Sequence, residues 1–83
     1  MKIYQWLFFD TSCGGSYLAT GKSKEEADIR AWEHVLEAET YCGFCEWSAS
    51  NYLDFTKDTR HYFSYDDGDG TLYCHYYETE VEV

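Results

Sequence analysis

One segment of the chain carries the signals of an α-helix, and the sequence on either side of it limits the available folds. Ser23 is followed three residues later by Glu26. At this spacing the two side chains can accept hydrogen bonds from the free backbone amides at a helix start. Apolar residues then recur at helical spacing, while Glu33 and Glu37 fall one turn apart on the side expected to face solvent. The expected buried face comprises Ala27, Ala31, Val35 and Ala38, with Ile29, Trp32 and Leu36 beside them. The sequence therefore predicts one helix over residues 23–39.

The segments before and after this helix have the patterns of β-strands. Residues 2–9 alternate in two mostly apolar sets, and a turn at 10–15 leads to a short second strand at 16–20. Three further strands are expected at about 46–55, 61–65 and 72–81, and the Asp-Gly pairs between the last two are typical of hairpins. The order β(β)αβββ predicts an α+β fold for residues 1–83 as a single domain. In it, one helix packs on an antiparallel sheet of four or five strands.

The chain contains no apolar run near the roughly 20 residues that a membrane-spanning helix needs. Its apolar start is interrupted by Gln5 and ended by Asp10, which favours a strand over a signal peptide. We therefore expect a cytoplasmic protein without a membrane partner, in which the cysteines remain reduced.

The net charge of −10 restricts the partners that the protein can bind. Sixteen acidic residues against six basic ones argue against direct binding of nucleic acid phosphates and against a basic membrane-surface helix. The excess of negative charge is concentrated after residue 40, in a segment that contains nine acidic and two basic residues. Two interpretations stay open: the charge keeps an aromatic-rich protein soluble, or it attracts a cationic partner.

A candidate partner-binding surface lies in the last part of the chain. Alternate residues of an extended strand share a face and are about 7 Å apart, so Glu78, Glu80 and Glu82 can imitate a row of phosphates. Tyr73 and Tyr77 supply aromatic contact, as tyrosines do at protein interfaces. The predicted partner-binding residues are Asp66, Asp67, Asp69, Tyr73, Tyr77, Glu78, Glu80 and Glu82. They favour a basic nucleic-acid-binding protein as the partner.

The Cys42-Gly-Phe-Cys45 segment offers an alternative role. A C-x-x-C turn can present two thiolates to zinc, and Cys13 with Cys74 or His75 could complete four ligands. The chain would then be a small zinc-stabilised interaction module. The other interpretation is that these cysteines are small apolar residues at a helix-to-strand corner, with no cofactor. We expect the second.

Catalytic motifs are missing from the sequence. It contains no G-x-S-x-G nucleophile elbow and no glycine-rich phosphate loop, and no spacing of carboxylates marks an acid–base pair. The sequence therefore predicts a binding protein and not an enzyme.

In size, acidity, lack of proline and order of elements, the chain resembles the small acidic proteins that bacteriophages encode against host defence, including anti-CRISPR and anti-restriction inhibitors. These are general features and not a shared motif, so no functional residue is carried over. The resemblance implies a non-catalytic inhibitor that acts in the host cytoplasm. Its expected target is a CRISPR effector or restriction enzyme whose access to nucleic acid it blocks.

Overall fold

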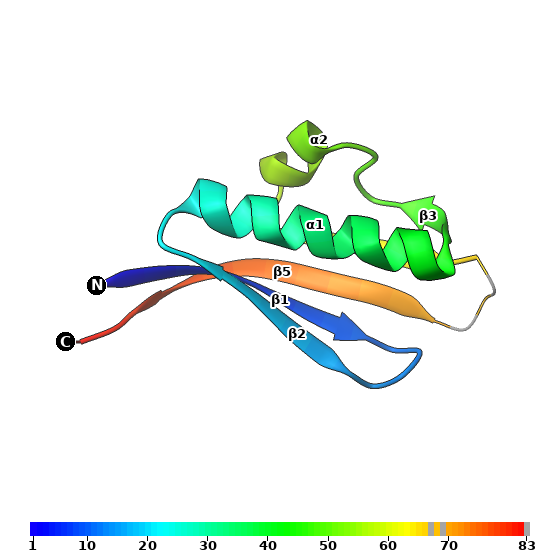
Figure 1. Ribbon diagram of the computed structural model, residues 1–83, viewed down its shortest axis with the longest axis horizontal. Coiled ribbons are helices and arrows are strands. Elements are labelled where there is room, and N and C mark those ends of the chain that lie inside the picture. Colours follow the sequence, from blue (N-terminus) through cyan, green and yellow to red (C-terminus); the bar gives the residue numbers. More distant parts are fainter. Residues whose placement is uncertain (67, 69, 83) are drawn as a thin grey trace.

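The computed structural model describes residues 1–66, 68 and 70–82. Within them, five strands form one antiparallel sheet in the order β2-β1-β5-β4-β3. The strands are β1 (Lys2–Asp10), β2 (Ser16–Gly21), β3 (Phe44–Trp47), β4 (Arg60–Tyr65) and β5 (Thr71–Glu80). The helices α1 (Lys24–Cys42) and α2 (Tyr52–Lys57) lie on the same side of the sheet (Figure 1). The predicted α+β fold, with a helix packed on an antiparallel sheet, is confirmed.

Helix α1 begins where the capping box predicts. The Ser23 hydroxyl accepts a hydrogen bond from the Glu26 amide over 3.2 Å, and the helix ends at Gly43, whose φ of 72° suits glycine. Gly21 lets β2 approach this helix start, because a Cβ there would lie 2.5 Å from the Ala27 nitrogen. The first helical turn is therefore held close to the sheet.

The buried face of α1 is narrower than predicted. Ala27, Ala31 and Val35 are fully buried, but Ile29 and Leu36 remain 42% and 43% exposed. Beside this stripe Trp32 packs against Phe55 and Phe63, whereas Ile29 and Leu36 stay largely in solvent. The expectation that Ile29 and Leu36 join the buried face is wrong.

The predicted strand at 46–55 is also wrong in its second half. β3 stops at Trp47 and contains a register shift between Phe44 and Glu46. The chain then turns into α2, whose first amides are capped by Asn51: its side-chain oxygen accepts from the Asp54 amide over 2.9 Å. This short helix delivers Phe55 to the core, where its ring stacks on Trp6 at 4.4 Å between centroids.

The core lies between the helices and one face of the sheet. Its largest fully buried side chains are Trp6, Phe8, Val35, Phe55, Phe63 and Leu72. Asp28 is also buried, and its carboxylate accepts from the Trp6 indole over 2.8 Å and from Lys24 over 2.6 Å. These two partners compensate for the removal of a charge from water. Neither described helix combines the length and the apolar character needed to cross a membrane.

Candidate protein-binding face

The side of the sheet opposite the helices is uncovered, and we call it the open face. Strand residues alternate between the two sides, so the burial of Trp6, Phe8, Phe63 and Cys74 against the helices assigns their neighbours to the other side. The open face consists of Ile3, Gln5, Leu7 and Phe9 on β1, Ser16, Leu18 and Thr20 on β2, Arg60, Tyr62 and Ser64 on β4, and Thr71, Tyr73, His75, Tyr77 and Thr79 on β5.

None of these open-face positions on the four strands is Asp or Glu, although the chain has sixteen of them. On the edge strand β3, Glu46 pairs with Ser64 and borders the face. On β1, β2, β4 and β5, strand alternation therefore keeps acidic side chains off the open face, and Glu46 is the one acidic residue of the described strands that lies in register with it.

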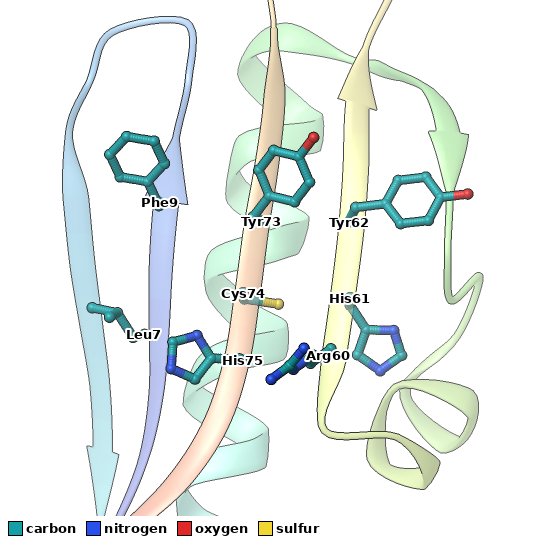
Figure 2. A pocket seen from close by; sticks show the side chains of 8 residues that line it. All are labelled: Leu7, Phe9, Arg60, His61, Tyr62, Tyr73, Cys74 and His75. Atoms are coloured by element: carbon teal, nitrogen blue, oxygen red, sulfur yellow. The ribbon is translucent and has the colours of Figure 1, made fainter.

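Aromatic side chains cross the open face in a row. Phe9, Tyr73 and Tyr62 come from β1, β5 and β4, and each is directly opposite the next in the strand register. They are 49%, 50% and 42% exposed. Figure 2 shows a second row beside them, made of Leu7, His75 and Arg60, which are also register partners. These six side chains, with parts of His61 and Cys74, line a shallow groove of about 400 Å³.

Arg60 gives this groove a positive charge. Among the described residues, no carboxylate lies within ion-pair distance of its guanidinium, and His75 is its partner across the strands. A fixed cation among exposed rings can stack on aromatic groups and donate several hydrogen bonds to a partner. The groove therefore combines exposed aromatic rings with one positive charge.

The structure separates the tyrosines of the predicted site from its glutamates. Tyr73 and Tyr77 lie on the open face, while Glu78 and Glu80 belong to the other side of β5. Lys2 approaches Glu78 to 3.1 Å, and the N-terminal amine lies 3.4 Å from Glu80. Hydrogen bonds from Tyr76 and then Lys2 lower the pKa of Glu78. These two glutamates are partly neutralised by neighbouring cations.

Two of the remaining predicted residues, Asp66 and Glu82, lie at the ends of the sheet. Glu82 follows β5 and is exposed, and Asp66 follows β4, where its amide donates to the Gly43 carbonyl over 3.0 Å. Asp67 and Asp69 lie outside the described residues. Both Asp66 and Glu82 therefore border the sheet and do not occupy its open face.

A further acidic surface follows α1; the sequence pattern predicted that two of its residues, Glu33 and Glu37, face solvent, but not that they form a binding surface. Glu25, Glu33 and Glu37 are exposed, and Glu33 and Glu37 line a hollow with Tyr17 of β2. Arg30 pairs with Glu26 at 3.1 Å. The helical period of these glutamates was the signal that could have revealed it. Acidic side chains thus lie along α1, on the opposite side of the sheet from the open face, and at the ends of the sheet.

The cysteines of the zinc alternative are not gathered in the described part of the chain. Cys74 is buried against the helices, whereas Cys13, Cys42 and Cys45 are exposed, and all four are thiols. Burial raises the pKa of the Cys74 thiol to about 12, which disfavours the thiolate that binds metal. Among residues 1–66, 68 and 70–82, no group of three potential metal ligands comes together.

Ser48 and His61 form the other polar pair of interest. The Ser48 hydroxyl is 2.8 Å from Nδ1 of His61, and Nε2 is 2.8 Å from the Phe55 carbonyl. The carbonyl requires a proton on Nε2, so the serine donates to Nδ1 while accepting from the Tyr62 amide. His61 is buried on β4, and its hydrogen bond to the Phe55 carbonyl joins β4 to α2.

Comparison of the chain with protein-family models, with curated proteins and with solved structures found no match.

Proposed function

We propose that the protein is a non-catalytic inhibitor that binds a basic nucleic-acid-binding protein, a host defence nuclease or its complex, through the open face. The observation that carries this proposal is the absence of carboxylates from the β1, β2, β4 and β5 positions of the open face, which exposes Phe9, Tyr62 and Tyr73 in a chain of charge −10. The phage origin and cytoplasmic location suggested by the general resemblance belong to the same proposal.

The desolvation of charges explains why such a face suits a protein partner. Burying an unpaired carboxylate in an interface costs several kcal/mol. A surface that loses its water on binding is therefore expected to lack carboxylates at its centre and to keep them at its rim. Exposed aromatic rings surrounded by charged residues match the composition of energetically important interface centres.

The acidic surroundings support the choice of a basic partner. Glutamates along α1 and acidic residues at the ends of the sheet act at long range, accelerating encounter with a cationic surface. In this proposal Asp66, Asp67, Asp69, Glu78, Glu80 and Glu82 contribute attraction, while Tyr73 and Tyr77 make the contact. Nucleic acid would be displaced because protein and phosphates compete for one cationic groove.

The experiment compares two tyrosine variants of the full chain. Tyr73 lies on the open face, whereas Tyr41, which is 81% exposed near the end of α1, does not. Tagged wild-type protein, Tyr73→Ser and Tyr41→Ser are used to capture proteins from bacterial extract, which mass spectrometry then identifies. We expect a basic nucleic-acid-binding protein with wild type and Tyr41→Ser, and its loss with Tyr73→Ser. Equal capture by both variants would contradict the proposal, as would binding that is unchanged at high salt.

A further inference from the structure

The two edges of the sheet differ in how they are protected. β3 is four residues long, contains a register shift and is followed directly by α2, all of which hinder pairing with another strand. β2 is six residues long, keeps an uninterrupted register with β1 and contains neither a charged residue nor proline. Edges of this second kind are available for pairing unless something covers them.

We propose that the β2 edge accepts an extended segment of the partner as an additional strand, with Lys or Arg at alternate positions and apolar residues between them. This inference rests on the proposed function, because it specifies how a basic partner is held. It adds a second contact to that of the open face.

The backbone of β2 has outward-directed groups for this purpose. The Thr20 carbonyl accepts from Arg30 over 2.7 Å and therefore points away from β1. Because strand residues alternate in direction, the backbone groups of Ser16 and Leu18 also point outward. In the described chain, the Arg30 side chain is the one group that bonds to this side of β2. An added strand can pair with Ser16 and Leu18 and replace Arg30 at Thr20.

The charged residues of α1 beside the β2 edge determine which side chains the added strand is expected to carry. α1 runs back along β2, since Gly21 approaches Ala27 and the Tyr17 ring stacks on His34 at 4.1 Å. Tyr17, Arg30, His34, Glu33 and Glu37 line a hollow there, and no described cation pairs with Glu33 or Glu37.

The spacing of these glutamates fits a strand. Residues four apart in a helix are separated by about 6 Å along its axis, and alternate strand residues by about 7 Å. Two cationic side chains on the helix side of the added strand can therefore meet Glu33 and Glu37. Its intervening side chains extend the open face beside Leu18, which pairs with Leu7, and are expected to be apolar.

A second copy of this chain fits the edge less well. Two β2 edges joined antiparallel about a two-fold axis would place both α1 helices on one side of the combined sheet. Glu33 and Glu37 of each copy would then face those of the other, and like charges at such a distance repel. The charge pattern favours a basic segment.

The test uses two peptides with the full-length protein: a capped Lys-Val-Lys-Val-Lys-Val peptide, and the same peptide with methylated backbone nitrogens on the edge that pairs with β2. Amide shifts of isotope-labelled protein report the site. We expect shifts at Ser16, Leu18 and Thr20 and at least tenfold weaker binding of the methylated peptide. Binding of the two peptides with equal affinity, shifts confined to the open face, or no binding would overturn the proposal.

Protein variants separate the backbone contribution from the charge contribution. Leu18→Pro removes an outward amide and should weaken peptide binding at least tenfold, whereas Leu18→Thr keeps that amide and should bind like wild type. The double variant Glu33→Lys, Glu37→Lys should no longer bind the Lys-Val peptide. We do not expect this variant to dimerise through β2. Wild-type protein that dimerises through β2 would overturn the choice of occupant. If the peptide does not bind while capture of the partner still depends on Tyr73, this inference is contradicted and the proposed function is retained. If the peptide binds at β2 while capture does not depend on Tyr73, only the proposed function is contradicted.

Discussion

The Trp6 indole nitrogen donates to the Asp28 carboxylate over 2.8 Å inside the core, joining the centre of β1 to the first turns of α1. The two residues are 22 positions apart in sequence. Lys24 donates to the other oxygen of the same carboxylate, so the buried charge has partners on both oxygens. This contact connects the helix to the sheet by a specific polar link inside the core.

Replacing Asp28 with alanine is expected to destabilise the fold by about 1–3 kcal/mol, because the buried indole N–H loses its acceptor. Asp28→Asn keeps an acceptor oxygen and should cost less. Urea unfolding of both variants measures the difference, with Glu25→Ala as an exposed control on the same helix. An Asp28→Ala protein as stable as wild type would show that the link contributes nothing.

Phe55→Ala is expected to cost about 3–5 kcal/mol, because it leaves a cavity against Trp6 where α2 meets the core. Leu53 lies on the same short helix but is 67% exposed, so Leu53→Ala should change stability little. Thermal unfolding followed by circular dichroism compares the two. Similar melting temperatures for both variants would mean that α2 is not anchored by Phe55.

Acid stability should depend on Asp10. Burial alone raises the pKa of this carboxyl, but hydrogen bonds from Ser12 and Tyr65 outweigh burial and hold the pKa below its ordinary value of 3.8. A depressed folded pKa means that the stabilisation is complete above the unfolded value and disappears as the pH falls through the folded one. The urea midpoint of Asp10→Asn should therefore decline less than that of wild type between about pH 5 and pH 2. Asp58→Asn is the control, and parallel declines for Asp10→Asn and wild type would refute the prediction.

The four thiols should divide into three that react quickly and one that reacts only on unfolding. Cys13, Cys42 and Cys45 are exposed, whereas Cys74 is buried with its pKa raised to about 12 by desolvation. Because the thiolate is the reactive form, a colorimetric disulfide reagent should titrate three thiols in native protein and the fourth after denaturation. Cys74→Ala should retain all three fast thiols; loss of a fast thiol in that variant would place Cys74 in contact with solvent.

Introducing a carboxylate on the open face should weaken binding of the proposed partner, even though that partner is proposed to be basic. Arg60→Glu places an acidic group in the aromatic groove, where dehydration is costly, and at least about a tenfold loss of affinity is expected. Lys57→Glu makes the same change in net charge away from the groove and should preserve or strengthen binding. Titration of the captured partner with both variants decides between them, and equal effects would assign the role of Arg60 to net charge alone.

Local signals predicted much of this fold from the sequence. The Ser23–Glu26 spacing located the helix start, and alternation located β1, β2, β4 and β5. α2 was not predicted, because a helix of six residues is too short to show a clear helical period in the sequence. Its capping residue Asn51 lies in an aromatic-rich segment that was predicted as a strand. The placement of Glu78 and Glu80 opposite Tyr73 and Tyr77 was readable from strand alternation.

The open face could not be located in the same way. Its aromatic row depends on Phe9 pairing with Tyr73 and Tyr73 with Tyr62, a register set by contacts between distant segments. Likewise, the burial of Asp28 depends on a tryptophan in another element. Such relationships exist only after the strands have been ordered in the sheet, which short-range patterns do not specify.

The pairing of β1 with β5 also constrains how the protein is made. The first strand joins the last one along nine register pairs, from Lys2 with Glu80 to Asp10 with Leu72, so the chain ends lie side by side (Figure 1). During translation β1 can pair first with β2, and its other edge stays unpaired until β5 has emerged from the ribosome. Completion of the sheet therefore waits for β5, and a chain cut short before β5 cannot join the β1–β2 hairpin to β4 and β3.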